Sequence, residues 1–149
     1  ACSIAGDVLS EAIATANVTH NHPEGIKGAM ATALAVFYLR TTKRKDVADV
    51  VEGMFYDITA KYKRGVFDET CQGTVPVALR IIKDSKDFED AIRLAMVWGG
   101  DSDTLGAIVG AMAEALYGIP VEIQRKAKSY LPADMKKVLD KFYKAYILL

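Results

Sequence analysis

Apolar residues recur three or four positions apart along most of this 149-residue chain, and no stretch alternates apolar and polar residues long enough to form a strand. This spacing places apolar side chains on one face of an α-helix. We therefore predict an all-α fold, a compact orthogonal bundle of about seven to eight helices. The predicted helices cover residues 7–16, 23–40, 46–62, 75–83, 105–117, 121–127 and 133–146, and one more is capped by Ser85 or Asp87 and ends near Trp98.

The third predicted helix is expected to end in Lys61-Tyr62-Lys63-Arg64-Gly65, since basic residues followed by glycine are typical of a helix C-terminus. Its inward face is expected to contain Val47, Val50, Val51, Met54, Phe55 and Ile58. Residues 66–74 are predicted to form a loop, and Pro76 is expected in the first turn of the next helix, where proline is tolerated. The helix over residues 23–40 is rich in glycine and alanine, so we expect it to be central and closely packed.

The amino-acid composition favours a globular protein and argues against some functions. With 51% hydrophobic and 26% charged residues, the chain has the balance of a globular protein, and its length suits one domain over residues 1–149. Equal numbers of basic and acidic residues argue against a nucleic-acid-binding surface. Two cysteines in no metal-binding spacing favour the cytoplasm, and no apolar run is long enough to span a membrane. A first residue other than methionine suggests a chain cut from something longer.

The strongest polar signal is Gly-Gly-Asp-Ser-Asp-Thr at residues 99–104. Two glycines permit a sharp turn, and Asp101, Ser102, Asp103 and Thr104 then bring four oxygen-bearing side chains to a helix start. Oxygen ligands of this kind suit a hard divalent cation such as magnesium or manganese. Asp, Ser and Thr are also the favoured helix N-caps, so a capping role is the alternative reading. Small residues at Gly106 and Gly110 in the following helix indicate close approach by a neighbouring helix or ligand.

Three other residue groups leave alternatives open. His20 and His22 flank a helix break, where they suit a zinc or nickel site, or a plain helix-entry loop with Thr19 as the capping hydroxyl. Trp98 belongs to the core or lines a pocket. Cys71 is a candidate nucleophile only if a histidine folds beside it.

Taken in order, residues 19–29 (THNHPEGIKGA), 71–76 (CQGTVP), 99–106 (GGDSDTLG) and 113–120 (AEALYGIP) resemble the ADP-ribosylglycohydrolase family. The resemblance implies an all-helical fold that uses two magnesium or manganese ions to remove ADP-ribose from modified groups. It implies metal ligation by Asp101, Asp103 and Thr104. It also implies that His20 lies near bound ADP-ribose and that Gly99, Gly100 and Ser102 border the metal pocket.

The chain departs from that family in one respect. The resemblance implies further metal ligands from a Thr-Asp-Asp cluster and an acidic residue in the N-terminal half. No Thr-Asp-Asp occurs in these 149 residues, and no glycine-rich phosphate loop of the family's kind precedes Thr19. The chain therefore resembles the C-terminal half of such an enzyme, and we assign no catalytic residue. A dinuclear hydrolytic centre needs a full cage of ligands, so we expect weak metal binding and poor hydrolysis by this chain alone.

Two functions account for the Gly-Gly-Asp-Ser-Asp-Thr segment, whereas a third alternative, a purely structural helical domain, leaves it unexplained. In the first, the chain is a hydrolase whose active site is completed by a second copy or another polypeptide. In the second, it is a non-catalytic remnant or binding module with a weak site for ADP-ribose or a cation. Apolar surface left by the missing half favours self-association or a complementing chain in either case, and neither nucleic acid nor membrane is expected as a partner.

Overall fold

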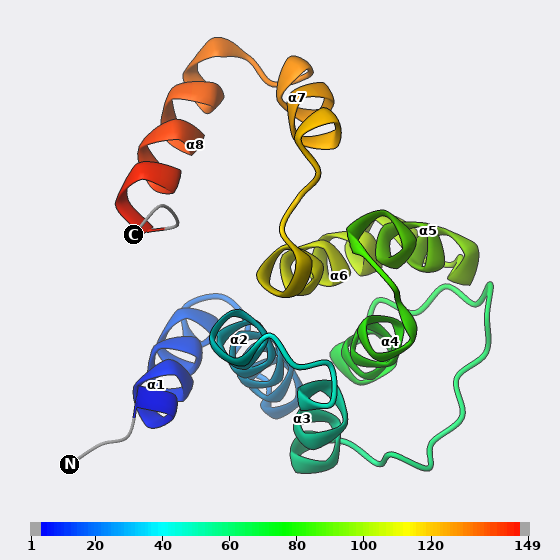
Figure 1. Ribbon diagram of the computed structural model, residues 1–149. Coiled ribbons are helices and arrows are strands. Elements are labelled where there is room, and N and C mark those ends of the chain that lie inside the picture. Colours follow the sequence, from blue (N-terminus) through cyan, green and yellow to red (C-terminus); the bar gives the residue numbers. More distant parts are fainter. Residues whose placement is uncertain (1–3, 147–149) are drawn as a thin grey trace. The chain divides into compact units, whose positions relative to one another are not determined.

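The computed structural model describes residues 4–146, which form eight α-helices and no strand (Figure 1). The all-α prediction is confirmed. The chain divides into two compact units, Ala1–Gly118 and Ile119–Leu149. The single-domain prediction stays a prediction. The helices are α1 (Ile4–Asn17), α2 (Pro23–Thr42), α3 (Val47–Phe55), α4 (Cys71–Asp84), α5 (Phe88–Trp98), α6 (Ser102–Tyr117), α7 (Val121–Ser129) and α8 (Ala133–Tyr146).

The core of the first unit is built around α2 and α4. Helix α2 packs on α1, α3, α4 and α6, and α4 packs on α2, α3, α5 and α6. The small residues of α2 allow this crowding, since Gly28, Ala31 and Ala35 are buried beside Leu34 and Leu39. The expectation that this helix is central is confirmed. Helix α6 contributes Leu105, Val109, Met112 and Leu116 to the same core.

Helix α4 begins earlier than predicted. Its first residue is Cys71 because Thr70 acts as the N-cap, and the Thr70 side chain accepts a hydrogen bond from the Gly73 amide at 3.1 Å. The predicted loop over residues 66–74 therefore ends at residue 70, and Pro76 lies inside the helix rather than in its first turn. Pro76 is fully buried, so its ring contributes apolar area to the core at the position where its backbone cannot donate a hydrogen bond.

Helix α3 is shorter than predicted, because it ends at Phe55 and not near residue 62. Tyr56 is extended, with φ −136° and ψ 164°, and Asp57 then folds a turn by accepting hydrogen bonds from the amide and hydroxyl of Thr59. The predicted inward face is also wrong in part. Its members Val50, Met54 and Ile58 are exposed, and the buried side chains of α3 are Ala48, Val51 and Glu52.

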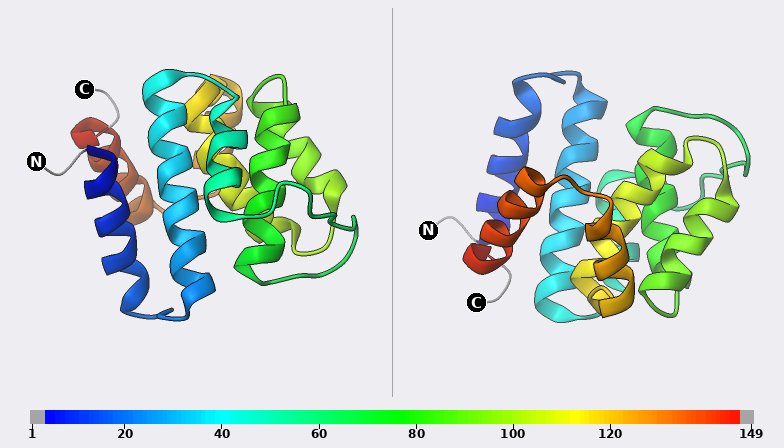
Figure 2. Two further views of the ribbon diagram at one scale, coloured as in Figure 1. Left: turned by 90° about the horizontal axis from the view of Figure 1, so that it is seen from below. Right: turned by 90° about the horizontal axis from the view of Figure 1, so that it is seen from above.

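Residues 56–70 connect α3 to α4 without a helix, arching away from the helices before returning (Figure 2). This connection contacts the turn between α5 and α6, where the Gly65 amide donates to the Trp98 carbonyl at 2.7 Å. We call residues 56–70 the long loop. It brings polar side chains to the part of the first unit that carries the Gly-Gly-Asp-Ser-Asp-Thr segment.

The second unit contains α7 and α8. Lys128 of α7 pairs with Asp140 of α8 at 3.1 Å and lies over the ring of Tyr143. Apolar residues recur along α8 as predicted, and Met135, Val138 and Phe142 are exposed. None of the helices within residues 4–146 has both the length and the apolar character that crossing a membrane requires.

Candidate functional site

The turn between α5 and α6 is made by two glycines in the left-handed backbone region. Gly99 has φ +77° and Gly100 has φ +72°. A Cβ atom on Gly100 would lie 2.2 Å from the carbonyl oxygen of Val66, so no side chain fits there. The sequence prediction that both glycines serve a sharp turn is confirmed, and the close approach of the long loop adds a second reason for Gly100.

The two aspartates after this turn lie at the start of α6, which begins at Ser102 instead of the predicted Leu105. Asp101 occupies the N-cap position, and its carbonyl accepts from the Leu105 amide at 3.0 Å, yet its side chain makes no capping hydrogen bond. A hydrogen bond with the Asp101 side chain, aided by the backbone amides of Asp103 and Thr104, holds the pKa of Asp103 below its usual value. The two carboxylates are therefore neighbours, as a shared cation site requires.

A cavity of about 270 Å³ opens beside Asp101, and we call it the aspartate pocket. Helices α4, α5 and α6 form one part of its wall and the long loop forms the other. Its lining residues are Lys61, Tyr62, Lys63, Val66, Asp68, Gly73, Thr74, Val77, Trp98, Gly99, Asp101 and Leu105. Of the two readings for Trp98, the pocket-lining one is the one observed.

Sequence reasoning missed three charged residues of this pocket. Lys61 and Lys63 were interpreted as the C-terminus of a helix, and Asp68 was not singled out. No sequence signal connects them to Asp101, because the long loop reaches the pocket only through tertiary contacts. Together they give the pocket two carboxylates, from Asp68 and Asp101, and two ammonium groups.

Asp68 is held in place by its own segment of chain. Its carboxylate accepts hydrogen bonds from the Thr70 hydroxyl at 2.6 Å and the Thr70 amide at 2.9 Å, and these bonds lower its pKa. The same carboxylate lies against Gly73, where a Cβ atom would meet it at 2.0 Å. An ionised carboxylate at this wall is thus fixed before any ligand arrives.

His20 lies elsewhere. It lines a second, largely apolar cavity of about 920 Å³ between α1 and α2, which also receives Cys71 of α4. Cys71 and Gly73 sit on different faces of the first turn of α4, so the two cavities share that turn but no lining residue. Of the predicted substrate-binding residues, only Gly99 lines the aspartate pocket; Gly100 and Ser102 adjoin it in the chain, and His20 lines the other cavity.

The two histidines have local roles. His20 Nδ1 lies 2.8 Å from the Thr19 hydroxyl, and His22 Nδ1 accepts from the Glu24 amide at 3.2 Å as the N-cap of α2. The capping residue is therefore His22 and not Thr19. Within residues 4–146, no three side chains of the His, Cys, Asp and Glu types gather as a metal site. Asp101 and Asp103, with the neighbouring hydroxyl of Thr104, fit an oxygen-preferring cation as one edge of a site.

Comparison with known proteins gives one match. A family model described as ADP-ribosylglycohydrolase matches residues 3–147 of the chain. No curated protein and no solved structure matches it.

Proposed function

The chain belongs to the ADP-ribosylglycohydrolase family, and from this premise we propose that its first unit binds a divalent cation beside the aspartate pocket and takes ADP-ribose as its ligand. Asp101, Asp103 and Thr104 are the proposed ligands of the cation, magnesium or manganese. The proposed reaction is hydrolysis of the N- or O-glycosidic bond between ADP-ribose and a modified group, in which water adds across the bond to give ADP-ribose and the free group.

One observation carries this proposal: the side chains of Asp101 and Asp103 lie beside each other at the start of α6. Two ionised carboxylates in contact repel each other, and a divalent cation between them removes that repulsion. The side chain of Asp101 makes no capping hydrogen bond, so helix capping does not occupy its oxygens. When bound, such a cation supplies Lewis acidity and lowers the pKa of a coordinated water.

The other residues of the aspartate pocket have proposed roles toward the ligand. Lys61 and Lys63 provide positive charge for the diphosphate, and Trp98 provides an aromatic wall. Gly99, Gly100 and Ser102 border the cation. His20 contacts ADP-ribose only if the ligand extends past the first turn of α4 to the second cavity. A variant of His20 alone would therefore test its contribution to binding.

We propose further that this chain alone hydrolyses poorly. Two carboxylates and a hydroxyl form one edge of a cage, and the described residues gather no third acidic or histidine ligand there. A second copy or a complementing chain would supply the remaining ligands in a homo-oligomer or a mixed complex. The second candidate function, a non-catalytic module that binds ADP-ribose or a cation weakly, rests on the same observation.

Calorimetric titration of the full chain with magnesium tests the cation site. We expect Asp101→Asn and Asp103→Asn each to weaken magnesium binding at least about tenfold, because each removes a charged ligand. Asp134→Asn is the matched control, since Asp134 is also an acidic residue in the first turn of a helix, α8. Equal affinity in all four proteins would refute the proposed site.

Release of ADP-ribose from a modified peptide, measured with magnesium present, separates the two candidate functions. Turnover by the chain alone that Asp101→Asn abolishes would contradict the proposed incompleteness. Turnover that appears only at concentrations where the chain self-associates would support completion by a second copy.

A further inference from the structure

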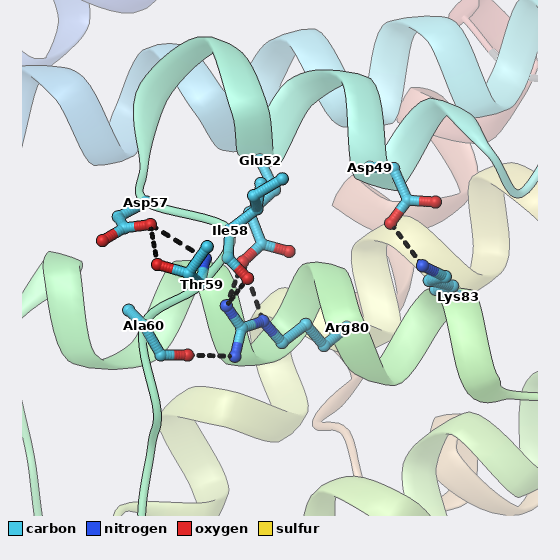
Figure 3. A network of polar contacts seen from close by, with 8 residues as sticks. All are labelled: Asp49, Glu52, Asp57, Ile58, Thr59, Ala60, Arg80 and Lys83. Atoms are coloured by element: carbon cyan, nitrogen blue, oxygen red, sulfur yellow. Dashed lines mark hydrogen bonds and ion pairs between the residues drawn. The ribbon is translucent and has the colours of Figure 1, made fainter.

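Arg80 of α4 joins this helix to α3 and to the long loop. Its Nε donates to Glu52 Oε1 of α3 at 2.7 Å, its Nη1 donates to the Ala60 carbonyl at 2.7 Å, and its Nη2 donates to the Ile58 carbonyl at 3.1 Å (Figure 3). Glu52 is only 4% exposed, so this carboxylate depends on Arg80 for its charge partner.

The next contact reaches the aspartate pocket. The guanidinium of Arg80 lies over the ring of Tyr62 at 4.8 Å, and Tyr62 lines that pocket. Lys61 lies between Ala60 and Tyr62 in the chain, so Arg80 holds the residue on each side of it. A planar guanidinium can make these bonds and the ring contact together, whereas an ammonium group cannot.

We propose that Arg80 is a positioning residue for the aspartate pocket: it fixes residues 58–62 of the long loop so that Lys61, Tyr62 and Lys63 form the loop's part of the pocket wall. The role of this wall in ligand binding rests on the proposed function, but the positioning itself does not. Arg80 does not line the pocket and touches no ligand; it acts through the loop it holds.

A neighbouring ion pair provides the matched comparison. Lys83, one turn along the same helix, pairs with Asp49 of α3 at 2.7 Å (Figure 3). Both pairs connect α4 to α3, but the pair of Lys83 with Asp49 does not involve the long loop. A role limited to joining the two helices would therefore make the Arg80 and Lys83 variants alike in their effect on the loop.

The test is native-state cleavage of the full chain by trypsin, with fragments identified by mass. Cleavage after Lys61, Lys63 or Arg64 reports on the long loop. Cleavage after Lys43, Arg44 or Lys45, between α2 and α3, reports on a segment that Arg80 does not touch. Global unfolding exposes both segments, so it raises cleavage at both. Cleavage that rises in the long loop while the rate between α2 and α3 stays constant, and so raises the ratio of the two rates, therefore reports release of the loop itself.

We expect Arg80→Lys to raise this ratio about tenfold, since it retains a charge for Glu52 but loses the bonds to the two carbonyls. Lys83→Gln should leave the ratio unchanged. If Arg80→Lys fails to fold, Tyr62→Ala should raise the ratio by a smaller factor, because it removes the ring under the guanidinium but leaves the hydrogen bonds of Arg80 in place. A ratio that stays at the wild-type value in a folded Arg80 or Tyr62 variant would overturn the proposal.

Titration with ADP-ribose connects the positioning to the proposed function. We expect Arg80→Lys to weaken ADP-ribose binding and Lys83→Gln to leave it unchanged. A wild-type chain that binds no ADP-ribose would contradict the proposed function alone, and the cleavage ratio would then decide whether Arg80 holds the wall. If Arg80→Lys raises the cleavage ratio but binds ADP-ribose as tightly as the wild type does, this wall is not important for binding.

Discussion

Replacement of Gly100 by alanine should destabilise the protein well beyond the usual effect of a surface substitution. Gly100 has φ +72°, and an alanine in this left-handed region costs about 1–2 kcal/mol. The new Cβ would also lie 2.2 Å from the Val66 carbonyl oxygen and 2.9 Å from its carbon. These are backbone atoms, so relief requires the long loop to move, at a cost typical of overpacking, about 1–3 kcal/mol. The expected total is about 2–5 kcal/mol.

Gly65 offers a matched control. It has φ +73°, almost the same as Gly100, but a Cβ atom there would meet nothing within 4 Å. Gly65→Ala should therefore show the backbone cost alone, about 1–2 kcal/mol. The difference between the two variants isolates the contact between the long loop and the turn that precedes Asp101.

Urea unfolding followed by circular dichroism measures both variants, with the free energy taken from the midpoint and slope. We expect Gly100→Ala to lose at least about 1 kcal/mol more than Gly65→Ala. Equal losses would refute the reasoning, because they would mean that the long loop does not press on Gly100 in solution. The comparison requires the same dependence of the unfolding free energy on urea concentration in the wild type and both variants. A changed slope would indicate a changed denatured or native state.

Three further outcomes are expected. Met112 is fully buried, so Met112→Ala should lower the free energy of unfolding by about 2–5 kcal/mol in the same urea assay, and a loss below about 1 kcal/mol would contradict its place in the core. The Tyr56 hydroxyl is buried and has no hydrogen-bond partner among residues 4–146, so Tyr56→Phe should leave stability unchanged or raise it, and a marked loss would reveal a missed partner. Hydrogen bonds from Thr59 and Thr70 lower the pKa values of Asp57 and Asp68, so their stabilisation is fully present above the ordinary value of 3.8 and is lost as the pH falls through the lowered values. As the pH is lowered from about 5 to about 2, the urea midpoint should therefore fall less in the Asp57→Asn/Asp68→Asn double variant than in the wild type. An equal fall in the two proteins would argue against these bonds.

The sequence by itself determined the all-α class and the identity of most helices, because helical spacing of apolar residues is a local property that burial then satisfies. It also located the turn at Gly99 and Gly100, since only glycine adopts that backbone at little cost. The family was recognisable from the order of its motifs, for the same reason: each motif is a short run of residues. The metal-ligand roles of Asp101, Asp103 and Thr104 remain a prediction.

Tertiary structure decided where helices stop and what surrounds Asp101. The apolar pattern predicted a helix to residue 62, but the chain is extended at Tyr56 and turns at Asp57. Arg80 then binds the carbonyls of Ile58 and Ala60 from 22 and 20 residues away. The same contacts bring Lys61 to the aspartate pocket, while packing of α1 on α2 assigns His20 to another cavity. Bonds between residues distant in sequence leave no periodic signal, so only the folded chain could reveal which polar side chains share a pocket.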